Sequence, residues 1–447
     1  MRPSPATRTF RRLARQLERE GKDSEAVWRE VLAVAPGDEE ATLAVEAMLS
    51  ARGAYEVGVV QHIVEEVAKS LGRDIPFDIL CGTSVGALNA CALAAFADDP
   101  ASRAAKMVKV WEDLRVEELV QPDLKGLFAM STRWFRKARS AEEVPAREGG
   151  LVDPAGLEQL IERVIPFDAI DRNMQAGHLD ALTVSTTHVA TGRTIVFVHR
   201  REHDLPPWSL DPTITPRAVR MAPVHTFASA AIPILFRAVR IDGEYHCDGG
   251  LRQNVPLSPA RRLGARSVLV VNPRHIERKV DESPDNRTLD AFPGPMFLLG
   301  KTLNALLLDR IDTDLARLQS INDILEAGRR RYGDGFLDAI NEELGHAKGR
   351  GMRPMRAMLV RASRDIGKVA ADYVKSPTFA KRVTGNAGRL LRRLADQGDP
   401  DEADLLSYLL FDGEFARQLI DVGRDDAKAR HEELCAFFEA RAREGRA

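Results

Sequence analysis

Apolar residues recur along the chain with two different periods, and these periods predict its elements. Residues 7–35 carry apolar side chains at helical spacing, with a break at Gly21-Lys22 and an end at Pro36-Gly37-Asp38. From about Thr42 onward, short apolar runs of strand length alternate with helical segments. This alternation is typical of a mixed α/β protein with a partly parallel sheet.

Several runs have the length and composition of strands. Two pairs of them flank turn sequences, and Asp242-Gly243 in particular is a strong signal for a tight hairpin. The predicted strands are Phe77–Cys81, Ala181–Val189, Thr194–Val198, Ala238–Ile241, Glu244–Cys247 and Ser267–Val271. The alanine-rich stretch Ala87–Phe96 predicts a helix directly after the first of these strands.

The pattern divides the chain into three parts. Residues 1–40 predict a helical extension that weakly resembles a single tetratricopeptide repeat. Residues 41–275 contain the α/β pattern, and a polar segment over 276–290 predicts a linker. The rest of 276–447 predicts an almost wholly helical region with no cluster of catalytic residue types.

Composition and charge narrow the class of protein. The chain has 447 residues, of which 44% are hydrophobic and 29% charged, so disorder, collagen and coiled coil are excluded for the whole chain. Its 64 basic and 66 acidic residues argue against a nucleic-acid partner. No signal peptide or spanning segment stands out, which predicts a cytoplasmic protein whose membrane contact is peripheral.

The cysteines and acidic residues indicate neither a metal nor a cofactor. Cys81, Cys91, Cys247 and Cys435 have no metal-binding spacing and are expected to be reduced thiols. No calcium-loop pattern occurs either. We therefore expect the chemistry to depend on protein side chains alone.

The strongest chemical signal is the G-x-S-x-G sequence from Gly82 to Gly86, with Ser84 at its centre. It follows a predicted strand and precedes a predicted helix, the context of a nucleophilic serine on a sharp turn. The flanking glycines permit a close approach of strand and helix. The helix dipole would help to stabilise an anion at this turn. An ordinary turn serine is the less favoured interpretation.

A serine nucleophile needs a base. His275, His346 and His431 lie downstream, but none is part of a distinctive motif. Asp248 follows the Asp242-Gly243 hairpin and opens a glycine turn. Its carboxylate could take the serine proton if it were oriented and partly desolvated, whereas a plain turn aspartate is equally common before glycine.

Three motifs together resemble the patatin-like phospholipases. The segment Ala51–Val59 looks like the end of that family's glycine-rich loop, Gly82–Ala90 like its nucleophile turn, and Asp248-Gly249-Gly250 with Asn254 and Pro256 like its Asp-Gly-Gly motif. The resemblance covers roughly residues 42–275. It implies a three-layer α/β fold and hydrolysis of lipid acyl esters by a Ser84-Asp248 dyad without a catalytic histidine.

The resemblance fails at the loop that would stabilise the oxyanion. The family's G-G-G-x-R/K-G sequence keeps only Arg52 and Gly53 here. Met48-Leu49-Ser50 either replace the three glycines or precede a gap that deletes them, and Glu40–Met48 has a more helical than strand-like composition. Backbone N–H donors at this loop matter because losing one typically lowers the rate about 10²–10³-fold.

The sequence therefore supports three functions. The leading prediction is a lipid acyl hydrolase of the phospholipase or lysophospholipase type, acting on a phospholipid or another acyl-ester lipid at a peripheral membrane surface. Its residues would be Ser84 and Asp248 in catalysis, with supporting motif residues Arg52, Gly53, Gly82, Gly86, Gly249 and Gly250. The altered loop favours a weakly active or inactive patatin-like binding or scaffold protein. The third function, a histidine-triad esterase using His275, is disfavoured by the Asp-Gly-Gly motif.

Overall fold

The computed structural model gives the fold of the parts of the chain that carry the predicted motifs. It describes residues 42–46, 52–115, 155–201, 205, 208, 213–233, 235–252, 257–275, 311–344, 351–383, 388, 391–392, 407 and 410–444. The expected helical extension over 1–40 lies outside these residues. So do Met48-Leu49-Ser50, Asn254, Pro256 and His346.

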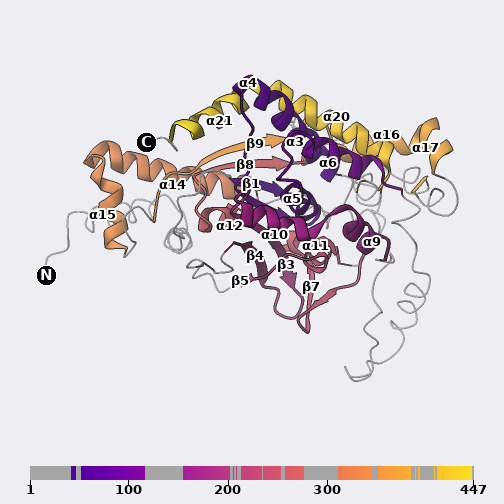
Figure 1. Ribbon diagram of the computed structural model, residues 1–447, viewed down its shortest axis with the longest axis horizontal. Coiled ribbons are helices and arrows are strands. Elements are labelled where there is room, and N and C mark those ends of the chain that lie inside the picture. Colours follow the sequence, from indigo (N-terminus) through magenta and orange to yellow (C-terminus); the bar gives the residue numbers. More distant parts are fainter. Residues whose placement is uncertain are drawn as a thin grey trace, which may run out of the picture.

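Within the described residues, nine strands form one mixed sheet with seven of them in the order β5-β4-β3-β2-β1-β8-β9 (Figure 1). Neighbours from β3 to β9 in this order pair in parallel, β4 is antiparallel to β3, and β5 is parallel to β4. The strands are β1 (Thr42–Glu46), β2 (Ile79–Thr83), β3 (Ala181–His188), β4 (Thr194–Arg200), β5 (Ile214–Ala218), β6 (Val239–Ile241), β7 (Glu244–Asp248), β8 (Ser267–Asn272) and β9 (Arg356–Arg361).

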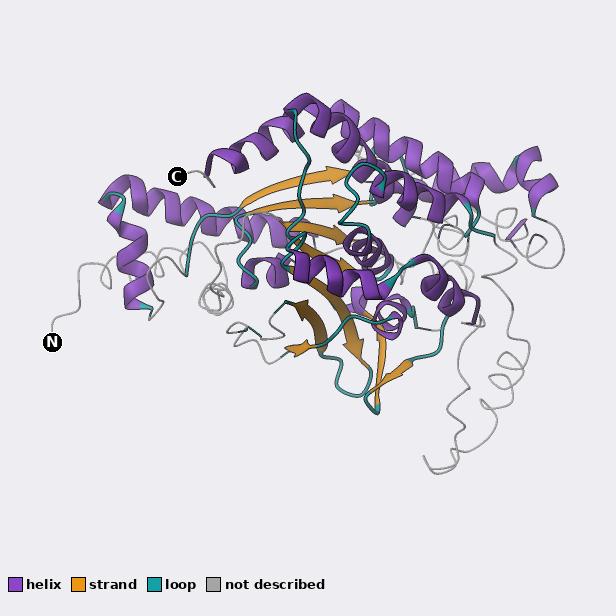
Figure 2. Ribbon diagram, in the orientation of Figure 1, coloured by secondary structure: helices purple, strands orange, loops and turns teal. Residues whose placement is uncertain are grey.

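Helices cover both faces of the sheet, as Figure 2 shows. The hydrophobic core on one face of the sheet includes side chains of α3 (Gly53–His62), α5 (Val85–Ala95), α6 (Arg103–Glu112), α9 (Ala155–Val164), α10 (Phe167–Ala176), α11 (Pro223–Ala230), α16 (Ile366–Lys375), α17 (Pro377–Arg382), α20 (Gly413–Ala429) and α21 (His431–Glu444). The other face packs against α12 (Leu257–Arg262) and α14 (Ile311–Tyr332), and α15 (Gly335–Glu343) packs on α14. Helix α3 continues through a π-helical turn, η1 (Ile63–Val67), into α4 (Ala68–Leu71), and η3 (Gly249–Leu251) is a 3₁₀ turn.

The strand side chains alternate between two hydrophobic cores. In β8, Val268 and Val270 belong to the core under α12 and α14, whereas Leu269 and Val271 belong to the core under α3 and α5. Strands buried on both faces are expected when helices cover both sides of a parallel sheet. The three-layer α/β fold expected from the sequence is confirmed.

Two local predictions are wrong. Residues 42–46 form β1, at the centre of the sheet between β2 and β8, although the Glu40–Met48 stretch has a helical composition. Pairing on both edges overrides the helix preference of alanine and glutamate. The region after 276, expected to be almost wholly helical, contains β9, which pairs in parallel with β8 and extends the sheet.

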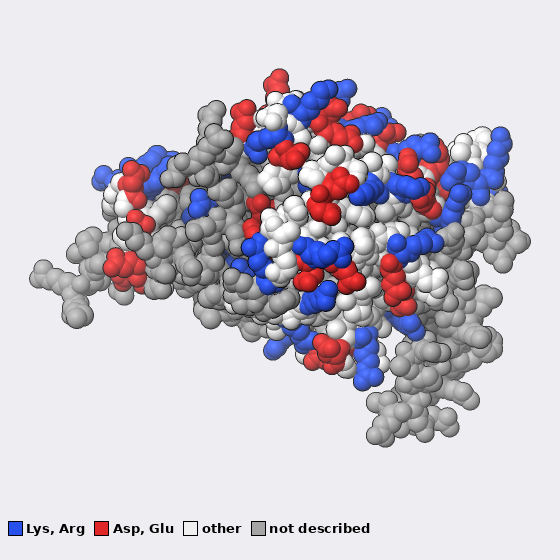
Figure 3. Space-filling model, viewed as in Figure 1, with Lys and Arg blue, Asp and Glu red and all other residues white. Residues whose placement is uncertain are grey.

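The cysteines, the hydropathy of the helices and the surface charge show no unusual feature in the described part of the chain. All four cysteines are free thiols, with Cys81, Cys91 and Cys247 buried. No helix in the described part of the chain is long and apolar enough to cross a bilayer. On the face shown in Figure 3, Lys and Arg side chains are interspersed with Asp and Glu side chains.

Candidate active site

Strands β2 and β7 meet end to end along one edge of β3. Strand β2 pairs in parallel with the first part of β3, and its last residue, Thr83, lies opposite Ser185. Strand β7 pairs antiparallel with the last part of β3, and its final residue, Asp248, lies opposite Thr186. Strands β2 and β7 therefore run in opposite directions and end opposite neighbouring residues of β3. This topology brings Ser84 and Asp248 together although 164 residues separate them.

Ser84 occupies a strained turn between β2 and α5. Its φ is 58° and its ψ is −129°, an uncommon conformation for a residue with a side chain. Such a backbone conformation stores about 1–3 kcal/mol and is found mainly at functional sites. A Cβ on Gly82 would overlap the carbonyl oxygen of Gly86, so the crossing of β2 and α5 requires glycine at position 82.

Ser84 and Asp248 form a buried hydrogen-bonded pair. The Ser84 Oγ donates to Oδ2 of Asp248 at 2.5 Å, and neither residue is exposed. The Ser84 backbone N–H donates to the Ser229 hydroxyl of α11 at 2.8 Å, and that hydroxyl donates to the Ser185 carbonyl at 2.7 Å. The expected hydrogen bond between Ser84 and Asp248 is present, with the turn anchored from a third element.

The backbone around Asp248 orients its carboxylate. The Gly250 N–H donates to Oδ1 at 2.7 Å, which leaves Oδ2 for Ser84. The Thr187 hydroxyl donates to the Asp248 carbonyl at 2.9 Å. A Cβ on Gly249 would overlap the Ser185 carbonyl, so the Asp-Gly-Gly turn lies directly against β3.

Burial changes the acidity of this carboxyl group. Desolvation raises the pKa of Asp248 from 3.8 to about 7, although the hydrogen bonds from Ser84 and Gly250 favour the charged form. A carboxylate with a pKa near neutrality is a much stronger base than an exposed aspartate. The site therefore meets the requirement that Asp248 be oriented and desolvated.

Two helices begin beside Ser84. Helix α5 starts at the next residue, Val85, and a Cβ on Gly53, the first residue of α3, would lie 2.6 Å from Cγ2 of Val85. The Asn89 side chain of α5 donates to the Gly53 carbonyl at 2.9 Å and to Oε2 of Glu56 at 2.7 Å. Because the first N–H groups of a helix have no partner within it, the start of each helix can offer backbone donors to an anion.

The end of strand β1 lies next to the turn that carries Ser84. Its last residue, Glu46, lies opposite Thr83, the residue before Ser84. The connection that carries Met48-Leu49-Ser50 lies outside the described residues and ends at Arg52. Arg52 is buried, and its Nε donates to the Ser407 hydroxyl at 3.0 Å.

Comparison with known proteins agrees with this geometry. Residues 50–261 match the family model for patatin-like phospholipases. The chain contains a patatin-like phospholipase domain. This match confirms, at the level of the family, the resemblance drawn from the three motifs. Phospholipases hydrolyse acyl esters of lipids.

Two further comparisons add little to this identification. No curated protein matches the sequence. Among solved structures, VipD from Legionella pneumophila matches at 12% identity and a TM-score of 0.25, over 86% of this chain and 92% of that chain.

His275 and His431, two of the histidines considered as a base for Ser84, contact other residues. Nδ1 of His275 shares a hydrogen bond of 3.2 Å with the Ala362 carbonyl, beyond β9. His431 lies on α21, where its ring contacts His62 and Ser70. The described contacts of these two rings thus lie away from the Ser84-Asp248 pair of the patatin-like domain.

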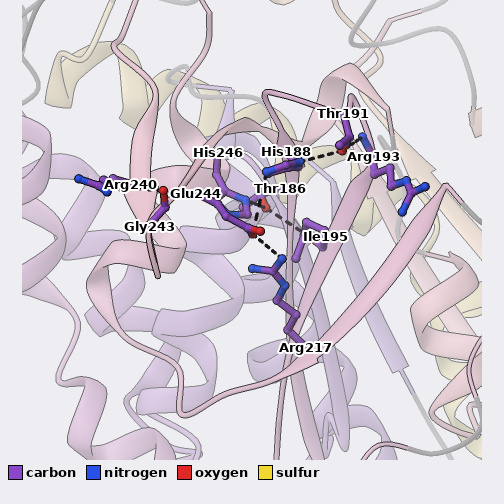
Figure 4. A network of polar contacts seen from close by, with 10 residues as sticks. All are labelled: Thr186, His188, Thr191, Arg193, Ile195, Arg217, Arg240, Gly243, Glu244 and His246. Atoms are coloured by element: carbon purple, nitrogen blue, oxygen red, sulfur yellow. Dashed lines mark hydrogen bonds and ion pairs between the residues drawn. The ribbon is translucent and has the colours of Figure 1, made fainter. Parts of the chain in front are cut away.

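A polar network continues from the site along β7 (Figure 4). His246 lies two residues before Asp248, and its Nδ1 shares a hydrogen bond of 3.0 Å with the Thr186 hydroxyl. Arg217 donates to Glu244 at 2.5 Å. Burial, with a contribution from the Arg217 charge, lowers the pKa of His246 to about 4. His246 is therefore neutral near pH 7 and supplies no cation to Asp248.

No group of three or more His, Cys, Asp or Glu side chains among the described residues is arranged to hold a metal ion. Sequence reasoning missed several residues that shape the site of the patatin-like domain, namely Ser185, Thr187, Ser229 and Ser407. Ser229 and Ser407 lie in largely apolar segments, Ser185 and Thr187 lie in β3, and the role of each depends on contacts between distant parts of the chain. Nothing in a single sequence distinguishes such residues from surface serines and threonines.

Proposed function

We propose that the protein hydrolyses acyl esters of lipids, such as a phospholipid or lysophospholipid at a membrane surface, with Ser84 as nucleophile and Asp248 as proton acceptor. The observation that carries the proposal is the 2.5 Å hydrogen bond from Ser84 to a desolvated carboxylate. The strained backbone of Ser84 and the family match over 50–261 support the same assignment.

The reaction uses each atom of the pair in turn. The Ser84 Oγ attacks the ester carbonyl carbon while its proton moves to Oδ2 of Asp248. The tetrahedral intermediate collapses when the alcohol leaves with the proton from Asp248, which leaves an acyl group on Ser84. Water then attacks this ester, giving its proton to Asp248, and the fatty acid departs as Ser84 is reprotonated.

The negative charge of the intermediate needs backbone donors. We assign this role to the N–H groups at the start of α5, at Val85, and at the start of α3, around Arg52 and Gly53. Both helix starts lie beside Ser84, and their dipoles favour negative charge there.

A second function has its own support. Ser84 and Asp248 are fully buried, and the family's three glycines are missing before Arg52. Both facts favour a patatin-like binding or scaffold protein with little or no hydrolytic activity.

An active-site probe separates the two functions. A hydrolase will be labelled by a fluorophosphonate at Ser84 and will release fatty acid from phospholipid vesicles or a short-chain ester. Ser84→Ala will lose both signals, whereas Ser320→Ala, which removes a hydroxyl from α14 on the opposite face of the sheet, will keep them. A folded wild-type protein that neither reacts nor hydrolyses would exclude the hydrolytic function and favour the binding or scaffold function.

A further inference from the structure

The C-terminal helices run alongside the helix that starts at the active site (Figure 1). Helix α20 packs directly on α3, and α21 contacts the continuation of α3 through η1 and α4. Three hydrogen bonds link this part of the chain to α21: Nε2 of His62 with Nδ1 of His431 at 3.0 Å, the Ser70 hydroxyl with Nε2 of His431 at 3.0 Å, and Nη2 of Arg73 to the Phe438 carbonyl at 2.7 Å. Both helices lie beyond the family match, which ends at residue 261.

The contact between α3 and α20 is a backbone contact made possible by one glycine on each helix. A Cβ on Gly58 would overlap the Ile420 carbonyl oxygen, and a Cβ on Gly423 would overlap the Tyr55 carbonyl oxygen. The two helix backbones therefore touch, and any side chain at either position would push them apart. Because the interior is close-packed, such a displacement would be transmitted along α3.

The beginning of α20 is itself firmly anchored. The Asp412 side chain accepts hydrogen bonds from the N–H groups of Glu414 and Phe415, which cap the helix, and also one from the Tyr373 hydroxyl. The Gly413 N–H donates to the Leu114 carbonyl at 3.1 Å, and a Cβ there would overlap the Glu112 carbonyl of α6. Helix α20 is thus fixed to α6 and α16 and can act as a rigid support for α3.

A second contact reaches the start of α3 itself. Ser407 is fully buried and accepts the hydrogen bond from Nε of Arg52, the residue before α3. A buried guanidinium is held in place by its hydrogen-bond partners, since leaving a donor unpaired is unfavourable. The C-terminal region therefore contacts α3 at its first turn and at its middle.

The inner side of the same turn faces the nucleophile. Gly53 packs on Val85, and the Trp111 indole N–H of α6 donates to Oδ1 of Asn89, whose amide holds the Gly53 carbonyl. The first turn of α3 thus lies between the site on one side and Ser407 with α20 on the other.

We propose that Ser407 and helix α20 are positioning elements of the active site, which hold the first turn of α3 where its N–H groups reach the acyl oxygen at Ser84. The inference rests on the proposed hydrolytic function for its catalytic consequence. The C-terminal region is then part of the catalytic unit, and Ser407, although distant in sequence, sets how well the oxyanion is bound.

The test uses the full chain and compares four variants. Ser407→Ala removes the hydroxyl that accepts from Nε of Arg52, and Ser407→Thr keeps a hydroxyl. Gly423→Ala separates the helix backbones, and Asp425→Ala alters an exposed residue of the same helix. A misplaced group far from the chemistry can lower a rate by about 10²-fold, so we expect kcat to fall about 10–10²-fold in Ser407→Ala and Gly423→Ala. We expect KM to change little, Ser407→Thr to regain most of the rate, and Asp425→Ala to match wild type.

Hydrogen–deuterium exchange of the peptide over residues 52–60 supplies a readout that does not depend on activity. We expect faster exchange there in Ser407→Ala and Gly423→Ala below their melting temperatures. Wild-type kcat and wild-type exchange in both folded variants would overturn the proposal. If wild type fails to react with a fluorophosphonate, the hydrolytic function is wrong, and the exchange result alone decides whether these residues position α3.

Discussion

The backbone N–H of Ser84 donates a 2.8 Å hydrogen bond to the hydroxyl of Ser229. The two residues lie on different elements, the β2–α5 turn and helix α11. The bond anchors the β2–α5 turn at Ser84, the residue whose backbone is strained. It also engages the Ser84 N–H, so under the proposed function the oxyanion would be bound by the residues that follow Ser84 and by the start of α3.

Replacing Ser229 tests how much this bond preorganises the nucleophile. Ser229→Ala leaves the Ser84 N–H and the Ser185 carbonyl without their shared partner in a buried site. Removing one partner of a buried hydrogen bond typically lowers stability by about 1–3 kcal/mol, so we expect a lower melting temperature together with a lower kcat. Thermal unfolding and ester hydrolysis measure the two effects. Wild-type values for both would show that the turn keeps its shape without Ser229.

The acidity of Asp248 predicts the pH dependence of the reaction. Because desolvation raises its pKa to about 7, the base is protonated and inactive in acid, and kcat/KM should rise with pH through an inflection near 7. An aspartate at its ordinary pKa would place this limb near 4. An acid limb below pH 5 would therefore contradict a desolvated Asp248.

The same shift predicts a change in stability with pH. The folded state holds a proton on Asp248 up to about pH 7, whereas the unfolded chain releases it near 4. Between these values the folded state binds more protons, so this residue lowers the free energy of unfolding as pH rises from about 4 to 7. Asp248→Asn, which cannot ionise, should remove this slope in denaturant titrations at several pH values. An unchanged slope would assign the effect to other groups.

Gly249 offers a test of the close contact between the Asp-Gly-Gly turn and β3. A Cβ at this position would overlap the Ser185 carbonyl, so Gly249→Ala must displace Asp248 or β3. Overpacking of this kind typically destabilises by about 1–3 kcal/mol. We expect a lower melting temperature and a slower fluorophosphonate reaction. Gly335→Ala is the matched control, because a Cβ there would meet nothing within 4 Å, and it should behave as wild type.

The altered loop before Arg52 gives the last prediction. Replacing Met48-Leu49-Ser50 by three glycines, or inserting three glycines between Ser50 and Ala51, tests the two possible alignments separately. If a backbone donor is missing, restoring it should raise the rate about 10²-fold in one of the variants. Brisk hydrolysis by wild type with no gain in either variant would show that the backbone around Arg52 and Gly53 already suffices, and would exclude the scaffold function.

Local patterns predicted much of the catalytic core. The Asp242-Gly243 turn is flanked by β6 and β7 as expected, with positive φ at both turn residues. The strand before Ser84 and the helix after it were also predicted, because their signals lie within a few residues of one another. Pairing partners were not predictable: β1 has a helical composition, and its strand conformation depends on two neighbours, β2 and β8.

Contacts between residues far apart in the sequence could not be predicted either, because they too depend on which segments meet in the folded protein. Ser229 and Ser407 lie in segments whose own patterns say nothing about Ser84 or Arg52. The meeting of Ser84 with Asp248 was expected from the family motifs. Its physical cause, two strands that share one edge of β3, depends on the register of the sheet.

The position of β9 has a consequence for how the protein is made. Strand β8 is buried on both faces, and β9, which pairs with its outer edge, is synthesised much later. A nascent chain that ends before β9 carries an apolar strand with an open edge, which is a template for aggregation. Fragments that stop near residue 275 should therefore be insoluble when expressed. A chain that ends before β9 is therefore expected to be degraded rather than to accumulate as a folded protein.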